Sequence, residues 1–279
     1  MNVVVLADRS PTNAWLIRAL EQAVTLRAII RPDWTAPRPA PISTRAPAST
    51  APISPTQRIL RRVRRLYFDR VDPAAERRLS HLLFPGGALP SPKAEVVCVP
   101  AWDINDVTTA EILRALDPDL LVVSGAPILR PAIHSIARYG TVNLHFGISP
   151  NYRGMHTIST PWHSRDYAHV GATLHYIDDG IDTGPVLFRV YPALTGDDDV
   201  VSVEAKITRC AADALCDFLS YMTAAPLGSR SPGRQFLETG RLVRFNDRSV
   251  RADIAARVRR IAGARAPETD ARVELYYRQ

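Results

Sequence analysis

The sequence predicts an α/β protein built on an open, mostly parallel sheet with helices on both faces. Short apolar runs rich in β-branched residues alternate along the chain with segments of helical spacing, which is typical of this class. The opening is the clearest case, because an apolar run at 3–6, a helical pattern at 14–23 and a second apolar run at 26–30 follow one another as strand, helix and strand.

The rest of the chain continues this alternation. Further strands are expected at 95–99, 120–124, 141–145, 172–177, 186–191 and 240–245. Helices are expected at 107–116, 131–139, 157–167, 201–222 and 251–262. Two successive parallel strands then end near Gly125 and His145, and ligands of open α/β sheets bind beyond the carboxyl ends of the strands.

Residues 58–70 form a separate, arginine-rich segment. Its apolar residues recur at helical spacing, so we expect an amphipathic helix. It carries Ile59, Leu60, Val63 and Leu66 among arginines 58, 61, 62, 64 and 65. Three interpretations stay open: a solvated face, an anion-binding surface or a membrane-surface helix.

Composition limits where the protein works and what it binds. No run of about 18 apolar residues is present to span a bilayer, and the apolar start at 3–6 indicates a first strand and not a signal peptide. A cytoplasmic location is the expectation. The formal charge of +7 and the pI near 9.7 favour anionic partners. The proline-rich stretch at about 32–57 has few large apolar side chains, so a mobile or extended loop is expected there.

A polar pair at the end of an apolar strand is the first sign of chemistry. Asn143 and His145 lie two residues apart, so both side chains project from the same face of the strand at 141–145. An amide N–H beside an imidazole can stabilise an oxyanion and move a proton, as attack on a carbonyl requires. Asp182, in a loop between two expected strands, is a candidate third group. An ordinary hydrogen-bonded turn is the alternative.

Two motifs support the catalytic interpretation. NLHFGISPNYRG, which begins at Asn143, followed by GATLHYIDDGIDTGPVLF, which begins at Gly171, resembles the folate-dependent formyltransferase family. That family includes glycinamide ribonucleotide transformylase, methionyl-tRNA formyltransferase and the sugar N-formyltransferases. The resemblance covers roughly residues 95–190 and implies a Rossmann-like formyltransferase fold. Residues 146–150 depart from the commonest family pattern and look closer to the sugar N-formyltransferases.

The resemblance implies roles for particular residues. Asn143, His145 and Asp182 fall on the catalytic positions, and His175 falls on the histidine of the strand before the aspartate. The donor, 10-formyltetrahydrofolate, is expected near Gly125, Ala126, Ile128, Leu129, Asp178, Asp179 and Gly180. Apart from the resemblance, Ser10, Thr12 and Asn13 precede the first helix and are expected to contact a phosphate of the acceptor, with helix capping as the alternative. Acceptor contacts are also expected from His175 and from Arg153, for which a structural role in the turn is the alternative. No metal is expected, and protonated His145 is expected beside Asp182, which raises its pKa.

The implied activity is transfer of a formyl group to a primary amine of a small anionic acceptor, such as a nucleotide-linked aminosugar or a specialised amino metabolite. Methionyl-tRNA formylation, hydrolysis of the folate donor and an anion-binding module with a dead site remain alternatives. Nucleic acid is the less favoured partner, and a homodimer stays open. We expect a catalytic domain at 1–225 and a basic C-terminal extension at 226–279.

Overall fold

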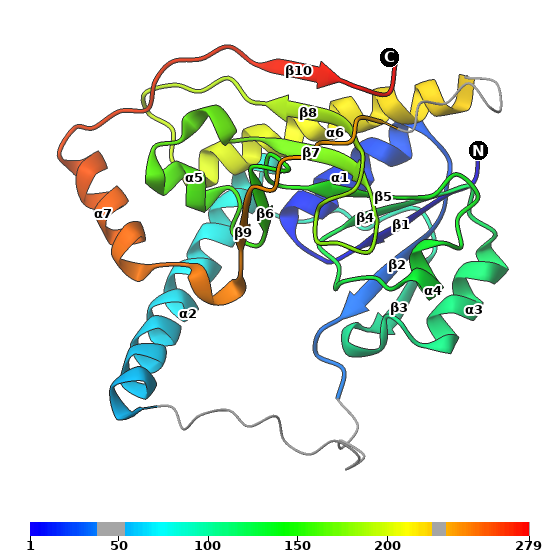
Figure 1. The fold of residues 1–279 in the computed structure, drawn as a ribbon, viewed down its shortest axis with the longest axis horizontal. Coiled ribbons are helices and arrows are strands. Elements are labelled where there is room, and N and C mark those ends of the chain that lie inside the picture. Colours follow the sequence, from blue (N-terminus) through cyan, green and yellow to red (C-terminus); the bar gives the residue numbers. More distant parts are fainter. Residues whose placement is uncertain (38–53, 225–232, 279) are drawn as a thin grey trace.

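The computed structural model describes residues 1–37, 54–224 and 233–278 of the chain. Its centre is an eight-stranded sheet in the order β10-β8-β7-β5-β4-β1-β2-β3, with helices on both faces (Figure 1). This architecture confirms the predicted α/β class. No helix within the described ranges is long and apolar enough to cross a membrane.

The sheet changes from parallel to antiparallel along its width. Pairs β1–β2, β1–β4, β2–β3 and β4–β5 are parallel, whereas β5–β7, β7–β8 and β8–β10 are antiparallel. Its strands are β1 (Val3–Ala7), β2 (Leu26–Asp33), β3 (Val96–Pro100), β4 (Leu120–Ser124), β5 (Thr141–His145), β7 (Ala172–Tyr176), β8 (Val186–Tyr191) and β10 (Arg272–Leu275). A second, two-stranded parallel sheet pairs β6 (Tyr152–Gly154) with β9 (Arg241–Val243).

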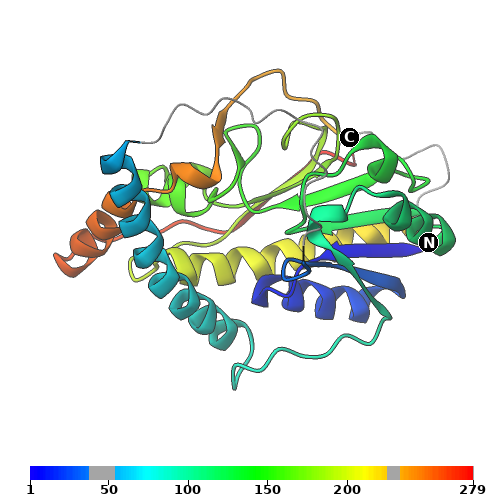
Figure 2. The same ribbon diagram turned by 90° about the horizontal axis from the view of Figure 1, so that it is seen from below.

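Helices lie on both faces of the sheet (Figure 2). The α-helices are α1 (Pro11–Ala23), α2 (Pro55–Leu83), α3 (Val107–Leu116), α4 (Pro131–His134), α5 (Ser159–Ser164), α6 (Val200–Ala224) and α7 (Val250–Ile261). Three 3-10 turns lie at Ala101–Asp103, Tyr167–His169 and Phe245–Asp247.

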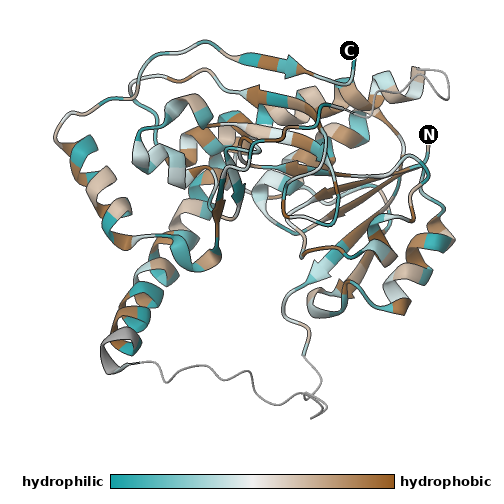
Figure 3. Cartoon of the chain, viewed as in Figure 1, coloured by the Kyte–Doolittle hydropathy of each residue, from teal (hydrophilic) through white to brown (hydrophobic). Residues whose placement is uncertain are grey.

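Alternation along the buried strands builds two cores. In β1, Val3 and Val5 pack on the face that α1 and α6 cover, while Val4 and Leu6 pack with residues of α3 and α4 on the other face. Burial of each such side chain stabilises the fold by about 1.5–3 kcal/mol. Figure 3 shows the central strands as the hydrophobic interior between more polar helices. The strand predicted at 3–6 is therefore buried on both faces, as a parallel α/β sheet requires.

Helix α2 is longer than the pattern at 58–70 predicts. It continues to Leu83 with Pro73 inside it, because Leu79 and Leu83 are buried and packing there offsets the hydrogen bond that proline removes. The apolar face of its first half points to solvent, with Ile59 64% and Val63 54% exposed.

Several smaller boundaries also differ from the expectations. The helix predicted at 157–167 ends at Ser164 and is followed by a separate 3-10 turn, and the helix predicted at 131–139 is only four residues long. The loop predicted at about 32–57 is shorter, because β2 runs to Asp33 and α2 begins at Pro55. The expectation of mobility for that loop falls mainly on 38–53, which lie outside the described residues. The predicted C-terminal extension adds β9 to the small sheet and β10 to the edge of the large one.

Candidate active site

Strand β5 presents Asn143 and His145 on one face of the sheet. Antiparallel pairing sets Asn143 opposite His175 of β7 and His145 opposite Thr173. The His145 side chain is 7% exposed and Asn143 is half-buried. The polar pair that ends this apolar strand is therefore held by the sheet itself.

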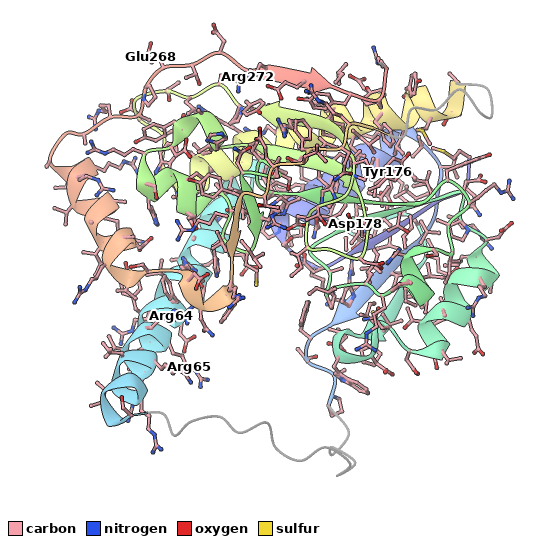
Figure 4. All side chains as sticks on the ribbon, in the orientation of Figure 1. Arg64, Arg65, Tyr176, Asp178, Glu268 and Arg272 are labelled. Carbon is pink, nitrogen blue, oxygen red and sulfur yellow. The ribbon has the colours of Figure 1, made fainter. Side chains whose placement is uncertain are left out.

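Asp182 reaches the same place through the loop between β7 and β8. The loop begins at Asp178, beside the end of β7 where Tyr176 is labelled (Figure 4). The Asp178 carboxylate shapes it by accepting hydrogen bonds from the Gly180 N–H (3.0 Å) and the Thr183 hydroxyl (2.7 Å). Asp182 has a left-handed backbone (φ 51°), and its side chain is 12% exposed. The structure thus brings the predicted third group to the strand pair.

The Asn143 amide connects the cluster. Its Nδ2 lies 3.2 Å from Asp182 Oδ1 and 3.3 Å from His175 Nε2. His175 Nδ1 lies 2.7 Å from the Tyr176 carbonyl oxygen and donates to it, whereas His175 Nε2 faces both the Asn143 amide (3.3 Å) and Asp182 Oδ1 (3.4 Å). The Asn143 amide thus has two partners within the cluster, and a carbonyl oxygen entering the site competes with one of them.

His145 faces an acceptor on each side of its ring. Nε2 lies 3.0 Å from the Tyr152 carbonyl oxygen and must donate to it, and Nδ1 lies 3.5 Å from Asp182 Oδ2. Burial nevertheless lowers the pKa of His145, and the Asp182 charge offsets this only in part. The net rise in the pKa of His145 that the sequence suggested is therefore not found, because desolvation outweighs the nearby carboxylate.

Asp182 is ionised in this cluster. Burial alone raises the pKa of its carboxyl group, but His145, His175 and the Gly154 N–H together outweigh burial and hold that pKa well below its usual value. The Gly154 N–H donates to Asp182 Oδ2 at 2.7 Å. An imidazole whose pKa is lowered by burial, next to a carboxylate whose pKa is held low, is the arrangement of a base that can accept a proton and be stabilised once it is charged.

Two glycines that the sequence interpretation assigned no contact complete the geometry. A Cβ on Gly147 would lie 2.5 Å from His145 Nε2, and a Cβ on Gly154 (φ +90°) would lie 2.3 Å from the Val243 carbonyl oxygen. Their presence in the motif that begins at Asn143 was the available signal. Both allow the chain after β5 to turn back over the histidine.

The residues expected at the donor lie on two neighbouring loops. Ala126 and Leu129, after β4, pack in one cluster with Ile177, which leads into the loop that carries Asp182. Ile128 is 69% exposed at the surface of this region. Gly125 has φ +68°. Of the remaining predicted donor residues, Asp178 bonds within its loop, Asp179 has an 87% exposed side chain, and Gly180 is exposed.

The predicted phosphate contacts at the start of α1 have internal partners. Ser10 is the N-cap, and its hydroxyl accepts from the Asn13 N–H at 3.3 Å. Asn13 Nδ2 donates to Asp8 Oδ1 at 2.7 Å, and the same carboxylate oxygen accepts the Ser10 N–H. Thr12 is buried. A carboxylate already bound to these donors repels an anion, so the geometry favours the helix-capping alternative.

Arg153 also bonds to the backbone. Its guanidinium lies 3.3 Å from the Ile181 carbonyl oxygen and 3.4 Å from that of Gly240. These contacts connect the loop that carries Asp182 to the segment before β9. An anionic acceptor would have to share the guanidinium with both carbonyls.

No group of three or more His, Cys, Asp and Glu side chains within residues 1–37, 54–224 and 233–278 could hold a metal ion. Within this part of the chain His163 Nε2 lies 3.6 Å from Asp253 Oδ1. Burial lowers the pKa of His163.

The family model and the sequence relatives that match this chain are all described as formyltransferases. Residues 91–219 match the family model described as formyl transferase. The chain is 30% identical over 139 residues to methionyl-tRNA formyltransferase of Chlorobium chlorochromatii, covering 47% of this chain and 44% of that protein. It is 35% identical over 119 residues to the enzyme of that name from Halorhodospira halophila, covering 42% and 38%. The chain thus spans less than half the length of these relatives.

Solved structures show the same fold. A sugar N-formyltransferase from Shewanella sp. has a TM-score of 0.54 at 14% identity, covering 92% of this chain and 86% of its own. Phosphoribosylglycinamide formyltransferase from Anaplasma phagocytophilum has a TM-score of 0.54 at 15% identity, covering 88% and 97%. The match of residues 91–219 and the shared fold agree with the motifs around Asn143 and Asp182. Residues 91–219 of this chain are thus similar to the formyl transferase family, and the described fold is one that solved formyltransferases share.

Proposed function

We propose that the protein transfers the formyl group of 10-formyltetrahydrofolate to a primary amine of a small acceptor. The observation that carries this proposal is the convergence of three side chains from separate segments: Asn143 Nδ2 lies 3.2 Å from Asp182 Oδ1, and His145 Nδ1 lies 3.5 Å from Asp182 Oδ2. An amide donor, a neutral imidazole and a fixed carboxylate are the groups that acyl transfer to an amine needs.

The residues beside this cluster fit a folate donor. Ala126 and Ile177 are half-buried and pack in one cluster with the buried Leu129, and Ile128, between Ala126 and Leu129 in the chain, is 69% exposed. Such a surface suits a flat heterocycle, while the backbone N–H and C=O groups around Asp178 offer polar contacts at its edge. When bound, the folate supplies the formyl carbon, whose oxygen gains negative charge as the amine attacks.

Each residue of the cluster has its own role in the proposed transfer. Asn143 donates an amide N–H toward the oxygen that becomes negative, giving up one of its two partners inside the cluster. His145 takes the proton that the amine must lose on Nδ1, because Nε2 donates to the Tyr152 carbonyl and burial lowers the pKa of the ring, which favours its neutral form. Asp182 stabilises the resulting imidazolium and is itself held by the Gly154 N–H. Deep burial of His145 and Asp182 strengthens both interactions.

The acceptor that we propose is a small anionic amine, such as a nucleotide-linked aminosugar or a specialised amino metabolite. The net charge of +7 supports an anionic acceptor. The second candidate is the aminoacyl end of methionyl-tRNA. It is favoured by the names of the sequence relatives and by the exposed arginines of α2 and α7.

A substrate panel tests the proposal. The purified protein is supplied with 10-formyltetrahydrofolate and, separately, with nucleotide-linked aminosugars, glycinamide ribonucleotide, methionyl-tRNA and no acceptor. Release of tetrahydrofolate and the mass of the formylated product are measured. We expect product from a small amine and a rate lower by about 100-fold or more in His145→Asn.

The other arms decide between the alternatives. Equal tetrahydrofolate release with and without an acceptor would show a hydrolase. Formylation of methionyl-tRNA alone, with binding that weakens steeply as salt rises, would replace the small acceptor. No turnover in any arm, with folate bound, would contradict catalysis and favour a binding module.

A further inference from the structure

A cavity of about 700 Å³ lies away from the Asn143–His145–Asp182 cluster, between α2, α5, α7 and the start of α6. None of the three cluster residues lines it. The volume falls in the range of small-molecule sites. Figures 1 and 2 show α2 and α7 at the same side of the molecule, next to α5.

Small and aromatic residues make up the apolar part of the lining. Ala74 and Ala75 of α2 stand on one wall, Ala256 of α7 on another, and Trp162 and Tyr167 contribute aromatic surface. Trp162 and Tyr167 pack with ring centroids 5.1 Å apart, so the aromatic wall is fixed. Larger side chains at the alanine positions would fill the space.

Cations dominate the polar part of the lining. Seven arginines and three aspartates line the cavity, a net charge of +4 with His163 neutral. Charged groups beside an apolar wall attract an ion of opposite sign more strongly than they do in open solvent. The cavity therefore favours a ligand with both an anionic group and an apolar body.

Some of these arginines already have partners and some do not. Asp199 accepts from both Arg78 and Arg260, and Arg257 pairs with Asp253 at 3.0 Å. Within the described part of the chain, Arg70 and Arg165 make no side-chain hydrogen bond or ion pair. These two guanidiniums come from different elements, α2 and the residue after α5, and both line the cavity.

We propose that this cavity is a second binding site, independent of formyl transfer, for a small amphiphilic anion: a phosphate or carboxylate attached to an apolar or aromatic body. Arg70 and Arg165 bind the anionic group, and the alanine walls and Trp162 contact the body. Nucleoside diphosphates and medium-chain acyl carboxylates share this chemistry and are the two sources to distinguish.

The test uses the aromatic sulfonate 8-anilinonaphthalene-1-sulfonate as the probe on the full chain, followed by fluorescence titration. We expect one probe per chain, with affinity about tenfold weaker or more in Arg70→Glu and in Arg165→Glu. Ala75→Trp, which fills the cavity, should remove binding. Arg61→Glu makes the same charge change at an exposed position of α2 outside the cavity and should alter affinity less than twofold. Circular dichroism confirms that each variant is folded.

Competition with the bound probe distinguishes a nucleoside diphosphate from an acyl carboxylate as the natural ligand. Uridine diphosphate or decanoate should displace the probe, and whichever displaces it at lower concentration gives the natural class; inorganic diphosphate should not. Absence of binding, binding that survives Ala75→Trp, equal weakening by Arg61→Glu, or equal displacement by inorganic diphosphate would each overturn the proposal. His145→Asn should bind the probe normally, so failure here is distinct from failure of formyl transfer.

Discussion

Replacing Asp182 with Asn tests the electrostatics of the site, because it removes the charge and keeps the shape. His145 Nδ1 lies 3.5 Å from Asp182 Oδ2, and both side chains are largely buried. Coulomb's law at that separation gives about 5 kcal/mol for an effective dielectric constant of about 20 and about 1.2 kcal/mol for water. At about 1.36 kcal/mol per pKa unit, loss of the charge should lower the pKa of His145 by roughly one to three and a half units.

The direction in which the pH profile should move follows from the proposed role of His145 as the base. Burial lowers the pKa of His145, and the Asp182 charge offsets part of that effect. Removing the charge should therefore lower the pKa of His145 further. If neutral His145 is the base, kcat/KM rises with pH through the pKa of His145, so its acid limb should move to lower pH in Asp182→Asn while the plateau falls by about 100-fold.

Two measurements check this result. The pH profile of kcat/KM gives the position of the acid limb. The NMR titration of the His145 ring gives its protonation without depending on turnover. The His145→Asn variant identifies the resonance by its loss. A limb and a ring titration that stay in place, or move to higher pH, would refute the base assignment and leave Asp182 as a residue that only shapes its loop.

Three further predictions concern stability. Burial raises the pKa of the Glu204 carboxyl group to about 7 from 4.5. The stability that the neutral carboxyl group contributes is therefore complete below the unfolded value and is lost as pH rises through 7. The difference between the free energies of unfolding at pH 5 and pH 8, from denaturant titration, should be smaller by about 2–3 kcal/mol in Glu204→Gln, and an unchanged difference would contradict this. Gly154→Ala, which forces a Cβ against a carbonyl oxygen at φ +90°, should cost about 2 kcal/mol or more by thermal melting, and a neutral effect would show that β6 can move. Tyr152→Phe loses the 2.8 Å bond to Asp166 and should cost about 0.5–1.5 kcal/mol in urea with turnover kept; lost turnover would show that the hydroxyl serves the site.

Strong local patterns made much of the fold predictable. The runs at 3–6 and 120–124 are fully apolar or nearly so, the run at 141–145 alternates polar and apolar residues, and each is a strand within one or two residues of the expected bounds. Period-2 alternation also placed Asn143 and His145 on one face before any contact was known.

Elements that depend on distant partners were missed. Strand β10 has exposed Arg272 and Val273, and it exists because β8 offers it an open edge. Strand β6 is only three residues long and pairs with β9 about ninety positions along the chain. The second half of α2 was hidden by Pro73, whose local cost is offset by packing against α6 that no local window contains.

In the candidate active site, too, some features could be predicted from the sequence and others depend on the assembled fold. The identities of Asn143, His145 and Asp182 could be read from two motifs, whereas the resting protonation of His145 depends on how deeply the fold buries it. The partners of Ser10 and Arg153 likewise depend on Asp8 and on the Ile181 and Gly240 carbonyls. Burial and backbone acceptors are properties of the assembled fold, so sequence patterns left both roles open.

The most direct test of the central claim is single-turnover formyl transfer by His145→Asn at saturating 10-formyltetrahydrofolate, with folate affinity measured on the same sample. We expect the rate to fall by about 100-fold or more while folate affinity stays within about threefold, because the imidazole acts on the proton that moves during transfer and not on the bound donor. A rate close to that of the wild-type protein, with folate bound, would contradict the assignment of His145, Asn143 and Asp182 as the catalytic cluster.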